Sequence, residues 1–523
     1  MRDARALCGA AVSDTAFTKA KGADMAGRYV VALDQGTTSS RSMLIDVEGN
    51  VVGVCQREFP QIYPHPGWVD HNPRDIVATQ LGTFTELLTQ CSVNPADIDC
   101  IGITNQRETT IIWDRATGEP IANAIVWQCR RTADVIRDIC GDDQEVFDEI
   151  IQRTGLRPDP YFSASKAKWL LDNTPGARER AEAGELCFGT VDTWLIWNLT
   201  AGRVHATDTT NASRTMLYNI HTCEWDPYLL DLFDIPASMM PDVKPSASVF
   251  GATANPNLPQ GIPICGVAGD QQAALFGQCC FEPGQAKNTY GTGCFFLMNI
   301  GTQAPISKNN LVTTIAASAP GEPTKYALEG SVFVAGALIQ WLRDELGIVK
   351  TAAETEEMAL SVPDTGGVYI VPAFTGLGAP YWDSEARGLV CGLTRGTNRN
   401  HMARAALEAL AYQMADLCAA MEADAGEPLA ELNVDGGASA NNFLMQFQSD
   451  IIKTKIRRPR NTETTALGAA FLAGLANGFW NGLDQLKALR SGDDVFEPAM
   501  DDAKVEELMA GWRDAVSRAR SER

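Results

Sequence analysis

The sequence lacks the signals that would assign the chain to a zinc-binding, disulfide-bonded or membrane-spanning class. Its five histidines form no His-Glu-x-x-His pattern, and none of its 14 cysteines stands in a Cys-x-x-Cys pair. These absences argue against a structural or catalytic zinc site. No stretch approaches the roughly 18 consecutive apolar residues that a membrane helix needs. Scattered cysteines in a long chain indicate a reduced, cytoplasmic protein.

Positive charge is also scarce. The chain carries 43 Lys and Arg against 65 Asp and Glu, which gives a formal net charge of -22. A nucleic-acid-binding protein needs a basic face, so no nucleic acid is expected as a partner, and no membrane insertion either. An anionic substrate would have to be met by local positive groups or by a metal ion.

Two common phosphate-binding motifs are missing as well. The chain contains no Gly-x-x-x-x-Gly-Lys-Ser/Thr string. The stretch GTGCFF at Gly291 lacks the third glycine of the dinucleotide fingerprint and runs into a strand-like segment instead of a helix. Neither a P-loop nor a dinucleotide fold is therefore expected.

The length of 523 residues exceeds what one hydrophobic core usually supports and predicts at least two domains. Residues 1–27 lack the apolar core of a secretory signal and are expected to be a disordered extension. A turn at Glu282-Pro-Gly lies near the expected boundary. The predicted domains are 28–278 and 279–515.

Hydrophobic periodicity predicts strands and helices in both halves. Strands are expected at 29–33, 40–46, 51–55 and 100–103, and helices at 75–88, 332–346 and 402–421.

Glycine-containing turns follow a strand at three places, at Asp34-Gln-Gly-Thr-Thr, Tyr290-Gly-Thr-Gly and Asp435-Gly-Gly-Ala. Glycine allows backbone N–H groups to approach an anion closely. One such turn can be an ordinary hairpin. Three in one chain favour phosphate binding by two domains of related design that face each other across a cleft.

The first turn carries further groups that suit a bound phosphate. The hydroxyls of Thr37, Thr38 and Ser39 can donate hydrogen bonds, and Arg41 can supply positive charge. Asp34 would repel a phosphate but can hold Mg²⁺, often through water.

Eight strings closely resemble the FGGY family of carbohydrate kinases: DQGTTSSR, GITNQRETT, NAIVWQCRRT, GTVDTWLIW, GDQQAALFGQ, NTYGTGCF, TGLGAPYWD and VDGGASANNFLMQFQSDI. The resemblance covers about residues 28–515. The resemblance implies an α/β fold of two actin-like (ribonuclease H-like) ATPase domains flanking a central cleft. It also implies ATP-dependent phosphorylation of glycerol to sn-glycerol 3-phosphate, the first step of glycerol utilisation. Mg²⁺ would accompany the ATP, ADP would be released, and the assembly would be a homodimer or homotetramer.

The resemblance implies roles for particular positions. Asp270 would be the catalytic base, and Asp34 would hold the metal through water. The polyol site would comprise Arg107, Glu108, Trp127, Tyr161, Asp270, Gln271 and Phe295. The nucleotide site would comprise Thr37, Thr38, Ser39, Arg41, Thr292, Gly336, Gln340, Gly437 and Asn441.

Simpler interpretations exist for several of these residues. Arg107 and Glu108 could be an exposed pair of little energetic value. Trp127 and Tyr161 are of types that more often pack in a core. Asp270 precedes a helical stretch and could be only its N-cap. The functional interpretation requires that these side chains meet in one cleft.

Two other functions stay open at this point. The chain could phosphorylate another polyol or a ketose such as xylulose. It could also be a non-catalytic actin-like nucleotide-binding protein, although the presence of Asp270, Arg107 and Glu108 argues against that. ADP release with a panel of polyols separates these functions.

Fructose 1,6-bisphosphate is expected to inhibit weakly or not at all. Some bacterial members of the family carry a glycine-rich basic loop that binds an inhibitory sugar bisphosphate, but here the stretch GATANPNLPQGIP contains no Lys or Arg. Without a cation the bisphosphate has no electrostatic partner. Initial rates across a bisphosphate titration measure this. Strong inhibition at physiological concentrations would show that another surface binds it.

Overall fold

The computed structural model describes residues 27–521 except 142, 382, 384 and 491. The expected extension at 1–27 therefore lies outside the described residues, apart from Gly27. Within the described part of the chain, no helix combines the length and the apolar character that crossing a membrane demands.

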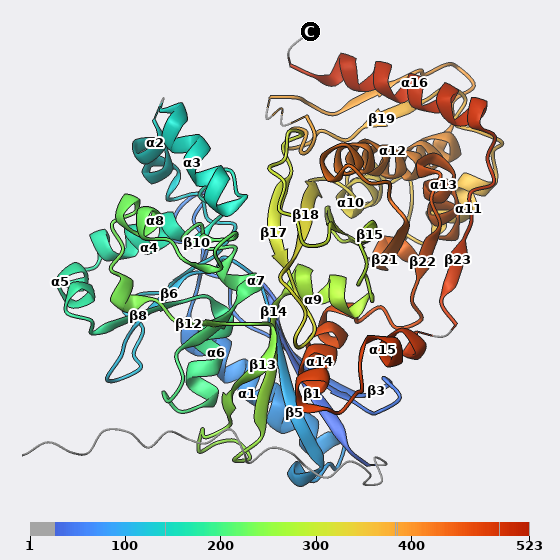
Figure 1. Cartoon of the computed structure of the whole chain (residues 1–523). Helices are drawn as coiled ribbons and strands as arrows, with labels where there is room; N and C mark the ends of the chain where they lie inside the picture. Colours follow the sequence, from blue (N-terminus) through green and yellow to red (C-terminus); the bar gives the residue numbers. More distant parts are fainter. Residues whose placement is uncertain (1–26, 142, 382, 384, 491, 522–523) are drawn as a thin grey trace, which may run out of the picture.

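A mixed sheet of six strands forms the core of the first half, in the order β13-β14-β5-β1-β2-β3 (Figure 1). Strands β1, β2 and β3 are antiparallel neighbours, while β1, β5 and β14 run parallel. Their bounds are β1 (Tyr29–Gln35), β2 (Ser39–Ile45), β3 (Val51–Glu58), β5 (Ile98–Asn105), β13 (Ala247–Ala252) and β14 (Pro263–Gly269).

The second half repeats this strand plan in a sheet of order β17-β18-β16-β15-β21-β22-β23. Hairpin β15–β16 pairs with antiparallel β18, as β1–β2 pairs with β3, and β15, β21 and β22 run parallel. The bounds are β15 (Gln285–Tyr290), β16 (Cys294–Asn299), β17 (Val312–Ala316), β18 (Lys325–Val332), β21 (Glu431–Gly436), β22 (Ile456–Arg458) and β23 (Asp494–Phe496).

The segment between β5 and β14 adds a lobe of short helices and two-stranded ribbons, drawn in cyan and green in Figure 1. Its helices are α2 (Ala133–Cys140), α3 (Gln144–Thr154), α4 (Ser163–Asn173), α5 (Ala177–Glu182), α6 (Val191–Leu199), α7 (Thr209–Ala212) and α8 (Pro227–Leu232). Its ribbons pair β6 (Ile111–Asp114) with β8 (Leu186–Gly189), β9 (Ala206–Asp208) with β12 (Asp242–Lys244), and β10 (Tyr218–Asn219) with β11 (Glu224–Trp225). Strand β7 (Ala124–Ile125) pairs with β4 (Asp70–His71).

The other helices lie outside this lobe, and several of them pack directly on the two sheets. They are α1 (Pro73–Gln90), α9 (Asp270–Gly277), α10 (Gly336–Asp344), α11 (Glu354–Leu360), α12 (Arg399–Ala425), α13 (Asn442–Ile452), α14 (Thr464–Asn477), α15 (Leu483–Leu489) and α16 (Asp502–Ala519). A short pair, β19 (Tyr369–Val371) with β20 (Leu389–Cys391), lies beside α12 and α16. The helix expected at 332–346 begins only at Gly336, because β18 continues to Val332.

Helix α14 joins the two halves. It follows β22 in sequence, yet it packs against β1, β5 and β14 of the first sheet and against α9 (Figure 1). Glycines permit this close approach, since a Cβ on Gly468 would lie 1.8 Å from the carbonyl oxygen of Ala273. A Cβ on Gly102 would likewise lie 2.2 Å from the carbonyl oxygen of Ala469. The interface between the halves therefore depends on backbone-to-backbone contact.

Gly468→Ala is expected to destabilise the protein, although alanine is the better helix former by about 1 kcal/mol. The new methyl group would collide with the backbone of α9, and overpacking of this kind costs about 1–3 kcal/mol. Gly82→Ala in α1 is the matched control, because there the Cβ would meet only the end of the movable Arg57 side chain. Thermal unfolding measures both variants. A melting temperature for Gly468→Ala equal to that of Gly82→Ala would contradict the steric argument.

Candidate active site

The first glycine turn connects β1 to β2 and brings opposite charges together. Asp34 and Arg41 are register partners across the hairpin, and Arg41 Nη2 lies 2.8 Å from Asp34 Oδ2. The other end of the Arg41 guanidinium pairs with Glu463, which directly precedes α14. Burial raises the pKa of Asp34, Arg41 opposes this, and the charges of Asp270 and Glu463 add to the rise. Negative charge is thus concentrated around Asp34.

The tip of the same hairpin is accessible. Gly36 N–H donates to the carbonyl oxygen of Ser39 at 2.9 Å and closes the turn. Thr38 is exposed, and Thr37 and Ser39 are half-buried. The Thr37 hydroxyl accepts a hydrogen bond from Trp127 Nε1 at 3.0 Å. This bond links the expected phosphate turn to the expected polyol site.

The second turn connects β15 to β16 and rests on the start of α10. The carbonyl of Thr292 accepts hydrogen bonds from the N–H groups of Ala335 and Ala337 at 2.8 and 3.1 Å. A Cβ on Gly336 would lie 2.6 Å from the carbonyl oxygen of Gly291, so only glycine fits there. Thr292 itself is exposed, as is Gln340 in the next turn of α10. Three of the predicted nucleotide residues therefore lie around one helix start.

The third turn connects β21 to α13. Gly437 is exposed, and a Cβ on it would meet nothing within 4 Å, which leaves open space for a ligand. Asn441 is the N-cap of α13, with its side-chain oxygen accepting from Leu444 N–H at 2.9 Å. Its amide nitrogen lies 3.3 Å from the Thr355 hydroxyl. This capping role was not predicted from the sequence, and a nucleotide contact by Asn441 stays a prediction.

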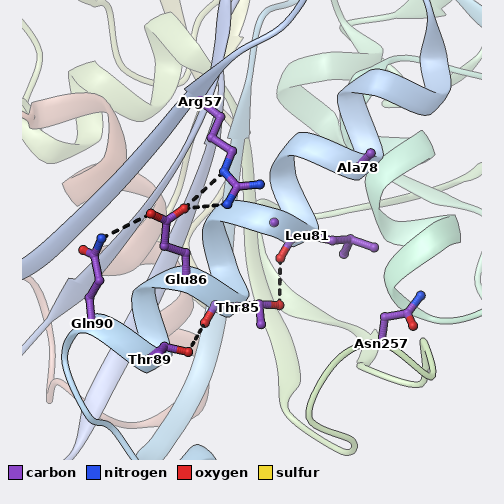
Figure 2. Close-up of a pocket in the computed structure, with 9 residues that line it drawn as sticks. Arg57, Ala78, Leu81, Thr85, Glu86, Thr89, Gln90 and Asn257 are labelled. Carbon is purple, nitrogen blue, oxygen red and sulfur yellow. Dashed lines mark hydrogen bonds and ion pairs between the residues drawn. The ribbon is translucent and has the colours of Figure 1, made fainter.

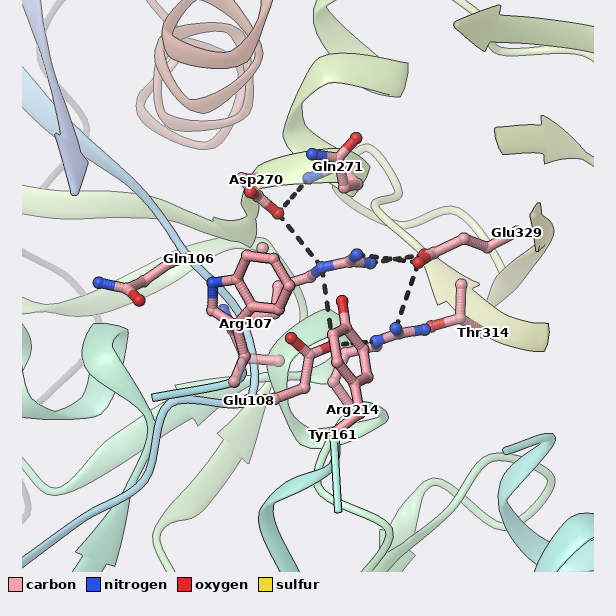
Figure 3. Close-up of polar contacts among 12 residues, drawn as sticks. Gln106, Arg107, Glu108, Tyr161, Arg214, Asp270, Gln271, Thr314 and Glu329 are labelled. Carbon is pink, nitrogen blue, oxygen red and sulfur yellow. Dashed lines mark hydrogen bonds and ion pairs between the residues drawn. The ribbon is translucent and has the colours of Figure 1, made fainter. Parts of the chain in front are cut away.

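Arg107 and Asp270 meet at the centre of the expected polyol site (Figure 3). Arg107 follows β5 and is 3% exposed, and its Nε lies 3.2 Å from Asp270 Oδ1. The Asp270 side chain is 33% exposed, so a ligand can reach it. Gly269 occupies the N-cap of α9, and Asp270 is the first helical residue. The interpretation of Asp270 as an N-cap is therefore wrong.

Three further charged residues, Glu108, Arg214 and Glu329, complete a buried cluster around Arg107 (Figure 3). The two terminal nitrogens of the Arg107 guanidinium donate to the two carboxylate oxygens of Glu329 on β18, at 2.6 and 2.9 Å. Arg214 donates to Glu108 at 2.6 Å and to Glu329 at 3.2 Å. Burial alone would raise the pKa of Glu329, but the two guanidinium groups hold it at about 2. Arg107 and Glu108 are thus not an exposed pair.

Arg214 and Glu329 were not predicted from the sequence. A signal for Glu329 existed, because it is the single acidic residue within the apolar stretch YALEGSVFVAG. A charge at such a position is almost never buried without a partner, so its presence implies a basic residue from elsewhere in the chain. Arg214, in a polar segment, gave no such signal.

Aromatic residues border the cluster. The rings of Trp127 and Tyr161 meet edge to face with centroids 5.6 Å apart, and both side chains are half-buried. The buried ammonium of Lys166 donates to the carbonyl oxygens of Tyr161 and Phe162 at 2.5 and 2.8 Å and so fixes this segment. Phe295 lies on β16 in the second sheet, and among the described rings none pairs it with Trp127 or Tyr161.

Two hollows lie away from these residues. One, of about 610 Å³, lies on the outer surface of α1 beside the Arg57–Glu86 ion pair of 2.8 Å (Figure 2). The other, of about 660 Å³, lies between the β2–β3 turn, the segment before α14, and the end of α15. Neither is lined by a residue expected to bind the polyol or the nucleotide.

Comparison with known proteins agrees with this geometry. The model of the FGGY family of carbohydrate kinases, N-terminal domain, matches residues 29–277, and that of the C-terminal domain matches 286–477. A glycerol kinase of Carboxydothermus hydrogenoformans is 59% identical over 498 residues, covering 95% of this chain and 99% of that protein. A glycerol kinase of Shewanella sp. is 58% identical, covering 95% of this chain and 100% of that protein.

Solved structures agree as well. The crystal structure of Plasmodium falciparum glycerol kinase with ADP is 39% identical with a TM-score of 0.90, covering 94% of this chain and 98% of that chain. A xylulose kinase of Lactobacillus acidophilus shares the fold at 23% identity and a TM-score of 0.83, covering 95% and 99%. These matches confirm the family predicted from the motifs and the two-domain α/β fold class. The chain belongs to the FGGY family of carbohydrate kinases.

Proposed function

We propose that this chain is an ATP-dependent glycerol kinase (EC 2.7.1.30), which transfers the γ-phosphoryl group of ATP to a terminal hydroxyl of glycerol. The products are ADP and sn-glycerol 3-phosphate, and the reaction is the first step of glycerol utilisation. The observation that carries the proposal is the Arg107–Asp270 contact of 3.2 Å inside a buried charge cluster. Glycerol kinases similar over nearly the whole chain support it, one of them solved with ADP.

The polyol would bind between donors and acceptors that are already in place. Arg107 can only donate and the Glu108 carboxylate can only accept, which suits hydroxyls because each does both. Glycerol has six heavy atoms, so at a ceiling of about 1.5 kcal/mol per atom its binding free energy cannot exceed about 9 kcal/mol. A small ligand therefore needs a prearranged site. The ion pairs of Arg107 with Glu329 supply that order.

Asp270 would accept the proton of the attacking hydroxyl. It lies in the first turn of α9, and its Oδ1 is 3.2 Å from Arg107 Nε, which holds the carboxylate in place. The transition state of phosphoryl transfer is loose, so positioning and charge stabilisation contribute more than the strength of the base. The role of Arg107 is then to hold both the carboxylate and the polyol in line with the nucleotide.

The nucleotide would bind along the three glycine turns. Thr38, Thr292 and Gly437 are exposed at their tips, where backbone N–H groups and hydroxyls can meet phosphate oxygens. Thr37, Ser39, Arg41, Gly336, Gln340 and Asn441 complete the proposed set. Closure of the two halves would exclude water, which otherwise competes as the phosphoryl acceptor.

Mg²⁺ is the metal proposed to accompany ATP, and it would neutralise the charge that develops on the phosphates. The surroundings of Asp34 fit a cation, because the negative charges of Asp270 and Glu463 act on its buried carboxylate in addition to the positive charge of its partner Arg41. Mg²⁺ keeps several waters and takes few protein carboxylates. Within the described part of the chain, no group of three or more His, Cys, Asp or Glu residues is arranged to hold a metal.

We also propose the cytoplasm as the location, the domain ranges 28–278 and 279–515, and a homodimer or homotetramer as the assembly. All thirteen cysteines of the described residues are free thiols, which suits a reducing compartment. The matches of the two family models at 29–277 and 286–477 support the domain ranges.

The substrate is tested by coupled ADP release with ATP and a panel of glycerol, xylulose and gluconate. Glycerol is expected to give by far the highest kcat/KM. A larger kcat/KM for xylulose would change the proposed substrate but leave the proposed kinase activity intact. No ADP release with any member of the panel would refute the transferase itself.

Asp270→Asn is expected to lower kcat by about 10²–10⁴-fold, because the amide keeps the shape but cannot accept the proton. ATP affinity and melting temperature should remain near wild type. Asp501→Asn is the matched control, because Asp501 is an exposed N-cap carboxylate on α16 and asparagine caps about as well. Steady-state kinetics measure both. Near-normal turnover in the Asp270 variant would remove this residue from the mechanism.

A further inference from the structure

Lys287 is a fully buried lysine beside the polyol site. It lies on β15, at 0% exposure, four residues before the Gly291–Gly293 turn that connects β15 to β16. Its ammonium donates to Gln271 Oε1 and, at 3.0 Å, to the Thr289 hydroxyl. Both partners are neutral, and none of the ion pairs among the described residues includes it. Lysine is almost never fully buried without a charged partner, so this one requires an explanation.

The wider surroundings of Lys287 are negatively charged. Burial and the charge of Arg107 lower the pKa of its ammonium, while the carboxylates of Asp435, Asp270 and Glu329 act in the opposite direction. Desolvating a charge is costly, and an apolar side chain of similar volume at such a position is often neutral or stabilising. Stability alone therefore does not account for a lysine here.

The contact with Lys287 determines which way the Gln271 amide faces. An ammonium has three donors and no acceptor, so only the amide oxygen can meet it. The NH₂ group must then point to the other side of the amide. In Figure 3 the Gln271 oxygen points away from Asp270 and Arg107. Gln271 thus presents a hydrogen-bond donor, not an acceptor, next to the proposed base.

We propose that Lys287 is a positioning residue for the polyol, which fixes Gln271 as a donor to a hydroxyl oxygen of the substrate. The inference rests on the proposed glycerol kinase function. With Gln271 fixed, the site offers donors from Arg107 and Gln271 and acceptors from Asp270 and Glu108, so each kind of group on a hydroxyl has a partner. Without Lys287 the amide is free to turn and offer its oxygen, which would displace a bound hydroxyl from its donor.

The contact also crosses between the two proposed domains. Gln271 belongs to α9 in the first half, whereas Lys287 belongs to the strand that ends in the second glycine turn. The orientation of the amide therefore depends on how the halves are placed. Lys287, which orients Gln271 for the polyol, thus lies on the strand, β15, that leads into the second glycine turn, which is proposed to bind the nucleotide.

Lys287→Met tests the inference, since it keeps the length of the side chain and removes the donor and the charge. The expected result is a rise of about tenfold or more in the KM for glycerol, with the KM for ATP changed less than about twofold. The melting temperature should be equal to or above that of wild type. Lys325→Met is the matched control, because Lys325 is another largely buried lysine of the second sheet but pairs with Glu322 and the carbonyl oxygen of Phe281, not with a residue of the proposed site. An unchanged KM for glycerol in Lys287→Met would overturn the inference.

A double-mutant cycle tests whether Lys287 acts through Gln271. In a Gln271→Leu background the Lys287→Met change should cost little, because the amide it orients is gone. Additive losses would assign Lys287 a separate role and overturn the proposal. Gln271→Glu keeps a partner for Lys287 but has no donor, so its KM for glycerol should rise as much as in Gln271→Leu. A wild-type KM in this variant, which does not depend on the folding of Lys287→Met, would also overturn it.

The same assays distinguish a failure of the inference about Lys287 from a failure of the proposed glycerol kinase function. Wild-type protein that phosphorylates glycerol, combined with silent Lys287 and Gln271 variants, would overturn only the inference about Lys287. Wild-type protein that does not phosphorylate glycerol would overturn the proposed function itself.

Discussion

Two arginines and two glutamates, all buried, form the constraint on which the centre of the molecule depends. Arg107, Arg214 and Glu108 come from the first half, and Glu329 comes from β18 in the second. Removing one partner from such a cluster leaves an uncompensated buried charge, at a cost of about 3–5 kcal/mol. The cluster therefore fixes the orientation of Arg107 toward Asp270 and ties it to the relative position of the sheets.

Much of the fold followed from the sequence because its signals are local. Apolar strands, glycine turns and the helices α1 and α12 each carry their pattern within a few residues. The start of α10 did not, because β18 extends to Val332 and the helix begins only at Gly336. The strand plan shared by the two sheets became visible only from the pairing of strands far apart in the chain.

The site was less accessible to sequence reasoning. The family motifs identified Arg107, Glu108 and Asp270 as site residues. Their contacts could not be predicted, because the partners come from distant parts of the chain. Arg214 and Lys287 lie in segments with no distinctive pattern, and their partners come from distant elements. The lone glutamate in the apolar β18 was the one such residue that could have been noticed. Buried charge that does not fit its local pattern is a useful marker of a site.

The packing of α14 on the first sheet also affects how the chain folds during synthesis. The apolar face formed by residues such as Val30, Ala32 and Ala268 is covered by Ala466, Ala470 and Phe471 of α14. The ribosome completes β14 well before it reaches this helix, and at 5–20 residues per second the delay is roughly 10–40 s. During that interval the nascent first half exposes part of its core. Chaperone binding to the growing chain would be concentrated on this face.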